Sequence, residues 1–65
     1  MQHSIEINHG GEVRWMTFDD ERDLVGLCDA VAREGYLRIE GDVIHNGRTL
    51  SGPRVYFQTY IVSIT

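Results

Sequence analysis

The sequence predicts an α+β domain in which one amphipathic helix packs on an antiparallel sheet of four to five strands. Three observations support this prediction. Apolar residues alternate with polar ones at both ends of the chain, they follow a helical period in between, and turn residues separate the segments. The expected order is β-β-α-β-(β)-β, with an optional short strand before the last one. With 65 residues, the chain has room for one small domain, residues 1–65.

The first two strands are expected to form a hairpin. From Ser4 to Phe18, apolar and polar residues alternate on both sides of the pair Gly10 and Gly11. Alternation with a period of two around a pair of glycines is typical of two antiparallel strands joined by a tight turn.

A helix is expected to begin at Asp19 or Asp20, because aspartate caps helix N-termini and further acids suit the positive end of the helix dipole. Gly35 supplies a left-handed stop. At about 100° per residue, one face of this helix is apolar and is expected in the core. That face comprises Leu24, Leu27, Cys28, Val31 and Ala32.

Beyond the helix, residues 36–40 alternate again and predict a third strand. The Asn46-Gly47 pair predicts a short hairpin over residues 43–50. Residues 54–65 are rich in β-branched and aromatic side chains and predict one long last strand. Its alternation is imperfect, so either both of its faces are covered or a bulge shifts its register.

The charge of the chain narrows the choice of partners. The chain contains ten Asp and Glu residues, six Arg and no Lys, which gives a formal net charge of −4. This balance disfavours general attraction to nucleic acid or to an anionic membrane. The amino end has no signal-peptide pattern, and the lone Cys28 cannot form an intrachain disulfide. We therefore expect a cytoplasmic protein without a membrane segment.

The His and Cys residues of the sequence do not indicate a catalytic or a metal-binding site. His3 is expected at a fraying amino end, and His9 and His45 in turns, so no base is placed beside a nucleophile. Cys28 is expected on the apolar helix face, where a thiol behaves as a small hydrophobic group. One Cys and three separated His lack the short spacings of zinc sites. We expect no enzyme activity, no cofactor and no metal.

The acidic residues are the most distinctive surface feature of the sequence. Solvated acids keep a small protein soluble and complement a helix dipole, and this explanation alone accounts for their pattern. The functional alternative is an anionic surface that engages the basic, nucleic-acid-binding groove of a partner protein. The candidate partner-binding residues are Asp19, Asp20, Glu21, Asp23, Asp29, Glu34, Glu40 and Asp42.

In its small size, acidity, short α+β pattern and lack of Lys, the chain resembles the small, acidic, phage-encoded anti-CRISPR proteins. Several of these block type I surveillance complexes by imitating DNA. The resemblance lies in size and composition, so no residue role is carried over. It implies a non-enzymatic inhibitor in the host cytoplasm that docks on a Cas subunit near its DNA-binding surface.

Two other functions stay open. A structural or assembly module would form a weak homodimer through a sheet face bearing Tyr56, Tyr60 and Val62, or through the edge of the last strand. A single-stranded nucleic-acid binder would stack bases on aromatic rings between arginines, although the net charge opposes it. Besides the two tyrosines, its residues would be Arg14, Trp15, Tyr36, Arg38 and Arg54.

Overall fold

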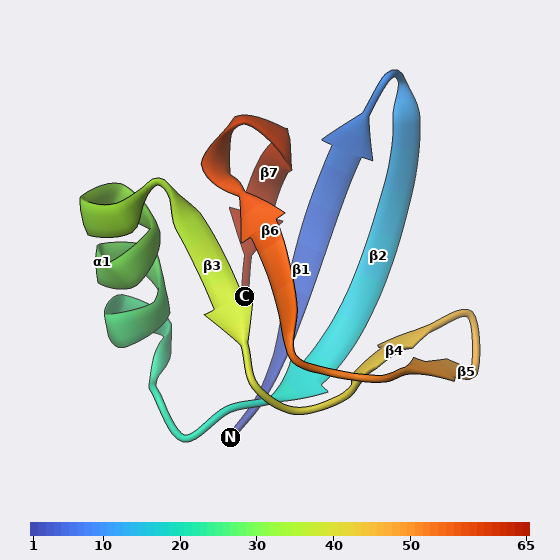
Figure 1. The fold of residues 1–65 in the computed structure, drawn as a ribbon, viewed down its shortest axis with the longest axis horizontal. Helices are drawn as coiled ribbons and strands as arrows, with labels where there is room; N and C mark the ends of the chain where they lie inside the picture. The colour runs from blue at the N-terminus through green and yellow to red at the C-terminus, as the bar shows by residue number, and fades with distance from the viewer.

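A computed structural model describes all 65 residues as one α-helix and seven strands (Figure 1). The α+β class and the predicted order of elements are confirmed. Neither the length nor the apolar character of any helix suffices to cross a membrane. The elements are β1 (Gln2–His9), β2 (Glu12–Asp19), α1 (Leu24–Glu34), β3 (Tyr36–Ile39), β4 (Val43–His45), β5 (Arg48–Leu50), β6 (Arg54–Phe57), the 3₁₀ turn η1 (Gln58–Tyr60) and β7 (Ile61–Ile64).

The strands form two antiparallel sheets. The large sheet has five strands in the order β5-β4-β2-β1-β7, and the small sheet pairs β3 with β6. In Figure 1, β6 passes in front of β1, and α1 lies beside β3. The small sheet and α1 together cover one face of the large sheet, which we call the inner face.

The core forms where alternating residues of the large sheet meet this cover. Ile5 pairs with Met16 across β1 and β2, so both side chains lie on the inner face. Burial of one such side chain contributes about 1.5–3 kcal/mol. The buried cluster consists of Ile5, Ile7, Met16, Phe18 and Val43 from the large sheet, Leu27 and Val31 from α1, and Leu37 and Ile39 from β3.

The predicted start of the helix is wrong by about four residues. The ladder between β1 and β2 continues to the pair Gln2 and Asp19, which keeps Asp19 in a strand. The Asp20 carboxylate then accepts a hydrogen bond from the Arg22 backbone N–H, a turn that competes with helical pairing. Asp23 is the N-cap instead, and its carboxylate accepts from the Gly26 N–H at 2.7 Å.

The buried face of α1 is narrower than predicted. Leu27 and Val31 are buried as expected, together with Ala30, but Leu24 is 42% exposed and Cys28 and Ala32 are exposed. The three buried residues follow the i, i+3, i+4 spacing of a single contact stripe. Cys28 and Ala32 lie at its margin, beside a shallow hollow between α1 and β7.

The last segment is two strands and not one. β6 pairs with β3, whereas β7 pairs with β1 in the other sheet. The turn η1 separates them, and its Gln58 N–H donates to the Gly35 carbonyl at 2.9 Å. The register of β7 on β1 also shifts next to Glu6, as the bulge alternative expected. A single strand cannot pair in both sheets, because their strands lie in different layers.

Both predicted hairpin turns and the helix stop are confirmed. Gly10 and Gly11 have φ of 63° and 84°, and Asn46 and Gly47 have φ of 51° and 75°. Positive φ at both central residues is the type I′ geometry that matches the twist of hairpins. Gly35 ends α1 with φ of 81°, and its N–H donates to the Val31 carbonyl.

The Gly35→Ala variant should lower the free energy of unfolding by about 1 kcal/mol, because a β-carbon disfavours positive φ. Urea unfolding at 25 °C measures this difference. Gly41→Ala is the matched control, since a β-carbon there meets no atom within 4 Å and no positive φ is required. Equal effects of the two substitutions would contradict the role of Gly35 as a left-handed cap.

Candidate functional site

The structure brings five of the eight predicted carboxylates together around one hollow of about 570 Å³, which we call the acidic depression. It lies among the end of β2, the connection from β2 to α1, the last turn of α1 and the residues that follow β3. No hydrophobic side chain lines it. The lining residues are Asp19, Asp20, Glu21, Arg22, Glu34, Arg38, Glu40 and Gly41.

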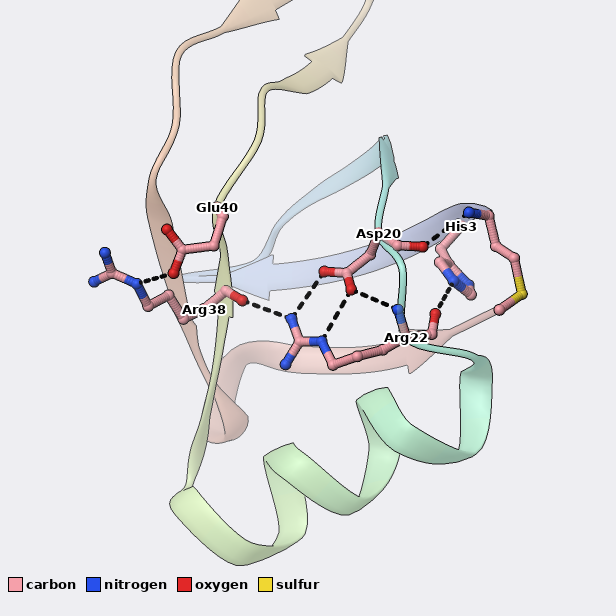
Figure 2. Close-up of polar contacts among 6 residues, drawn as sticks. His3, Asp20, Arg22, Arg38 and Glu40 are labelled. Carbon is pink, nitrogen blue, oxygen red and sulfur yellow. Dashed lines mark hydrogen bonds and ion pairs between the residues drawn. The ribbon is translucent and has the colours of Figure 1, made fainter.

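Asp20 and Arg22 both line the acidic depression and pair with each other (Figure 2). Arg22 Nε donates to Asp20 Oδ1 at 3.0 Å, and Arg22 Nη2 donates to Oδ2 at 2.8 Å. The side chain of Asp20 is only 9% exposed and that of Arg22 is 35% exposed. This two-pronged hydrogen bond lowers the pKa of Asp20 below its usual value and raises the pKa of Arg22.

Arg22 also ties three parts of the chain together. Its Nη2 donates to the Arg38 carbonyl at 2.8 Å, which joins the connection before α1 to β3 (Figure 2). Its own carbonyl accepts from His3 Nε2 at 2.9 Å. The Met1 amino group donates to the Asp20 carbonyl at 2.8 Å, and the Asp20 N–H donates back to the Met1 carbonyl. We call this set of contacts the Asp20–Arg22 clamp.

The clamp corrects the prediction that His3 lies at a fraying end. His3 is 7% exposed within β1, and its ring lies 5.6 Å from that of Phe18. The ladder of β1 holds the segment, and the hydrogen bond to the Arg22 carbonyl satisfies the imidazole. His3 therefore has a structural role in holding the loop that carries Asp20.

Glu40 and Arg38 form a second pair at the outer margin of the acidic depression. Arg38 Nε donates to Glu40 Oε1 at 2.6 Å, and both side chains are largely exposed. The hydrogen bond lowers the pKa of Glu40 and raises the pKa of Arg38. In water such a pair contributes little to stability, so its main effect is to fix where the carboxylate lies.

Three predicted carboxylates lie outside the acidic depression and have local partners. Asp23 caps α1, as described above. The Asp42 carboxylate accepts from the Gly52 N–H at 3.1 Å and holds two loops together. Asp29 lies on the exposed side of α1, 3.9 Å from Arg33, and forms an i, i+4 pair with it.

Within the depression, Asp19 and Glu21 have no ion-pair partner, and Glu34 lies 3.7 Å from Arg33 at the surface. Five carboxylates against two guanidiniums leave an excess of three negative charges. The sequence reasoning missed the two arginines. The signal was their spacing, because Asp20 and Arg22, like Arg38 and Glu40, stand two residues apart.

The aromatic residues of the two alternative functions do not share one face. Trp15 pairs with Glu6 and lies on the outer face of the large sheet, where it is 55% exposed. Tyr56 faces inward, and its hydroxyl donates to Met16 Sδ at 3.6 Å. Val62 belongs to β7 in the other sheet, so the face that was to bear Tyr56, Tyr60 and Val62 does not exist.

No group of three or more His, Cys, Asp and Glu side chains is placed to hold a metal ion. No protein-family model, curated protein or solved structure matches the chain.

The Asp20→Asn variant should lower the free energy of unfolding by about 1 kcal/mol at pH 6, with the loss limited by the partial exposure of Arg22. Because folding lowers the pKa of Asp20 below 3.8, its ionised form stabilises the fold fully above that value. The contribution is lost as the pH falls through the lower, folded-state pKa. The difference between the two proteins should therefore shrink below about pH 3.8.

Urea unfolding from pH 6 to pH 2.5 measures this dependence. Asp29→Asn is the matched control, because its side chain is exposed and its pair with Arg33 is long. That control should change the free energy of unfolding by less than about 0.5 kcal/mol at any pH. A constant difference between wild type and Asp20→Asn over the whole range would contradict the assignment.

Proposed function

We propose that the chain is a non-enzymatic inhibitory binding protein that presents the acidic depression to a basic, nucleic-acid-binding surface of a partner protein. The observation that carries this proposal is the convergence of five carboxylates from separate elements on one hollow without apolar lining. A surface of this kind attracts a basic partner and does not bury an apolar ligand.

The fixed positions of the carboxylates support the proposal further. The Asp20–Arg22 clamp holds the connection between β2 and α1, which carries Glu21 and follows Asp19, to β1 and β3. Rigid placement matters because the conformational entropy of ordering side chains opposes binding. Carboxylates that are already held in position lose less conformational entropy when they bind the arginines or lysines of a partner.

The roles of the carboxylates divide within the depression. Asp20 and Glu40 are bonded to arginines of the chain itself, so their charge is largely compensated. Asp19 and Glu21 are exposed without an ion-pair partner, and the exposed Glu34 has only a 3.7 Å contact with Arg33 and no hydrogen bond to it, so we assign these three residues to partner contact. Asp23, Asp29 and Asp42 are left out of the contact set, because they lie elsewhere.

The resemblance in size and composition to anti-CRISPR proteins suggests the partner. We infer that the target is a Cas subunit of a type I surveillance complex and that the bound chain competes with DNA for the subunit. DNA carries about one negative charge per 1.7 Å of duplex, so its binding surface on a protein is basic. A small acidic protein that occupies this surface prevents DNA recognition.

Reversal of two contact charges tests the proposal. Wild-type chain should reduce target-DNA binding by a purified type I surveillance complex, measured by gel shift, by at least tenfold. In the presence of the Asp19→Lys/Glu21→Lys variant, the complex should bind its target DNA as it does without the chain, because the variant places positive charges against a basic surface. The inhibition should also weaken between 0.1 M and 0.5 M salt. The distance over which salt screens charges is about 10 Å at 0.1 M and falls toward about 3 Å at 1 M.

The matched control is Glu12→Lys/Asp29→Lys. It changes the net charge equally, and both residues are exposed, ion-paired and outside the acidic depression. It should keep the inhibition within about threefold of wild type. If wild type leaves DNA binding unchanged, the Cas assignment fails, and if both variants lose inhibition equally, the depression is not the contact surface.

The outer face of the large sheet favours a second candidate function, self-association. Trp15 is 55% exposed there, and Val13 and Ile44 are exposed on the same face of β2 and β4. Exposed apolar residues gathered on one face are typical of an interface between proteins. This face replaces the one that the sequence predicted for a homodimer.

Sedimentation equilibrium between 1 and 200 μM tests the second candidate, with the concentration range chosen about the affinity of a weak dimer. Wild type should show a monomer–dimer equilibrium, and Trp15→Glu should sediment as a monomer because it places a charge in the apolar contact. Val25→Glu is the control, since Val25 is 76% exposed on α1. A wild-type monomer over the whole range would overturn this candidate.

A further inference from the structure

A second hollow of about 420 Å³ opens on the inner face, between the β1–β2 hairpin and β6, and we call it the β6 groove. It shares no lining residue with the acidic depression. Its volume lies within the range of about 300–1,000 Å³ that binding pockets occupy. Ile7, Met16 and Leu50 supply an apolar floor, while Tyr56, Phe57 and Tyr60 supply aromatic walls.

The β6 groove follows the free edge of a strand. β6 pairs with β3 on one side only, and no other backbone hydrogen bond involves Arg54–Phe57. All four of these consecutive residues line the groove. Because successive side chains of a strand point to opposite faces, a hollow that touches all four runs along the strand edge.

An open strand edge presents backbone N–H and C=O groups that a second strand can pair with. Four residues span about 13 Å at roughly 3.3 Å per residue, which matches four residues of an extended peptide. Alternate side chains of such a peptide would point toward the apolar floor. The geometry is therefore that of strand addition beside an apolar groove.

The charges that line the β6 groove indicate which charge its occupant carries. Glu12 and Arg14 line it and compensate each other at 3.3 Å. Arg54 also lines it and is half-buried, but it has no carboxylate partner. Arg54 Nε donates to the Tyr56 hydroxyl at 3.1 Å and its Nη1 donates to the Ser51 carbonyl at 3.5 Å, so only Nη2 has no partner in the chain. A carboxylate on the occupant would complete this site.

The edge strands of the chain, β6 itself included, do not supply this charge. β3, β5, β6 and β7 read YLRI, RTL, RVYF and IVSI, and none contains an acidic residue. A second copy that offered one of these edges to β6 would leave Arg54 uncompensated. The occupant that fits is a segment of a different protein.

We propose that the β6 groove binds an extended peptide segment of a partner protein, which adds a strand to β6, buries alternate apolar side chains on the floor and pairs one acidic side chain with Arg54. This site is separate from the acidic depression and does not depend on the function proposed for it.

Selection of random octapeptides on the immobilised full chain tests the proposal without knowledge of the partner. The enriched peptides should share alternating apolar residues and an acidic residue. In ¹⁵N NMR spectra, the most enriched synthetic peptide should shift the amides of Arg54–Phe57 and slow their hydrogen exchange. No enrichment, enrichment without the acidic residue, or shifts confined to other residues would overturn the proposal.

Two valines provide a matched pair of variants. Val55 in the β6 groove is 43% exposed, and Val62 on β7 is 56% exposed and outside the groove. Val55→Glu should weaken peptide binding at least tenfold by repelling the acidic residue, whereas Val62→Glu should leave the affinity within twofold. Circular dichroism establishes that each variant is folded. A dimer of wild-type chains that Val55→Glu dissociates would assign the groove to a second copy instead.

A double-mutant cycle tests the ion pair and does not require Val55→Glu to fold. Arg54→Gln and replacement of the peptide's acidic residue by its amide should each weaken binding about tenfold. Together they should weaken it little more than either alone, because both remove the same interaction. Additive effects would show that the acidic residue binds elsewhere and would overturn the proposed pairing.

Discussion

The inner face of the large sheet must be covered, and the rest of the structure follows from how a 65-residue chain achieves this. An eleven-residue helix and a two-stranded sheet are the whole cover. The last segment contributes to both layers, because β6 completes the cover and β7 returns to the edge of the large sheet. The 3₁₀ turn η1 is the step between layers, and the ring of its Tyr60 lies 4.3 Å from that of His9 on the hairpin.

The cover is shorter than the face beneath it, and this mismatch produces the two hollows. At the hairpin end, the inner side chains of β1 and β2 extend past the cover and leave the β6 groove open. At the opposite end, the Asp20–Arg22 clamp joins the layers with polar contacts, and no hydrophobic side chain lines the acidic depression. Different carboxylates therefore carry stability and free surface charge at that end: Asp20 bonds to Arg22, whereas Asp19 and Glu21 have no ion-pair partner.

Local patterns predicted those elements whose residues act on near neighbours in the chain. Alternation predicted the hairpin strands. The Gly-Gly and Asn-Gly pairs predicted the turns, and Gly35 predicted the end of α1. The start of α1 was mispredicted because Asp20 bonds to Arg22 across a turn, and this competes with capping in a way that residue types alone do not reveal. The break in the last segment depends on which sheet each half joins, which is a contact between distant residues.

The candidate site was predictable to the same extent. Residue type identified the acids, but only the fold separates Asp19 and Glu21, which lie free in the depression, from Asp23 and Asp42, which bond to backbone N–H groups. The β6 groove had no signal in the sequence. Its floor residues Ile7 and Met16 resemble ordinary core positions, and only the fold places them beside the unpaired edge of β6.

The exclusive use of arginine as the basic residue has a structural consequence at the clamp. Arg22 binds both oxygens of Asp20 and the Arg38 carbonyl at once, which requires a planar group with several donors in fixed directions. A lysine ammonium is a single point of charge and cannot span the carboxylate and the carbonyl in this way. The same property lets Arg54 donate to the Tyr56 hydroxyl through Nε and to the Ser51 carbonyl through Nη1, while its Nη2 has no partner in the chain. Arginine therefore joins the layers at the clamp and, at Arg54, also leaves one donor group unpaired.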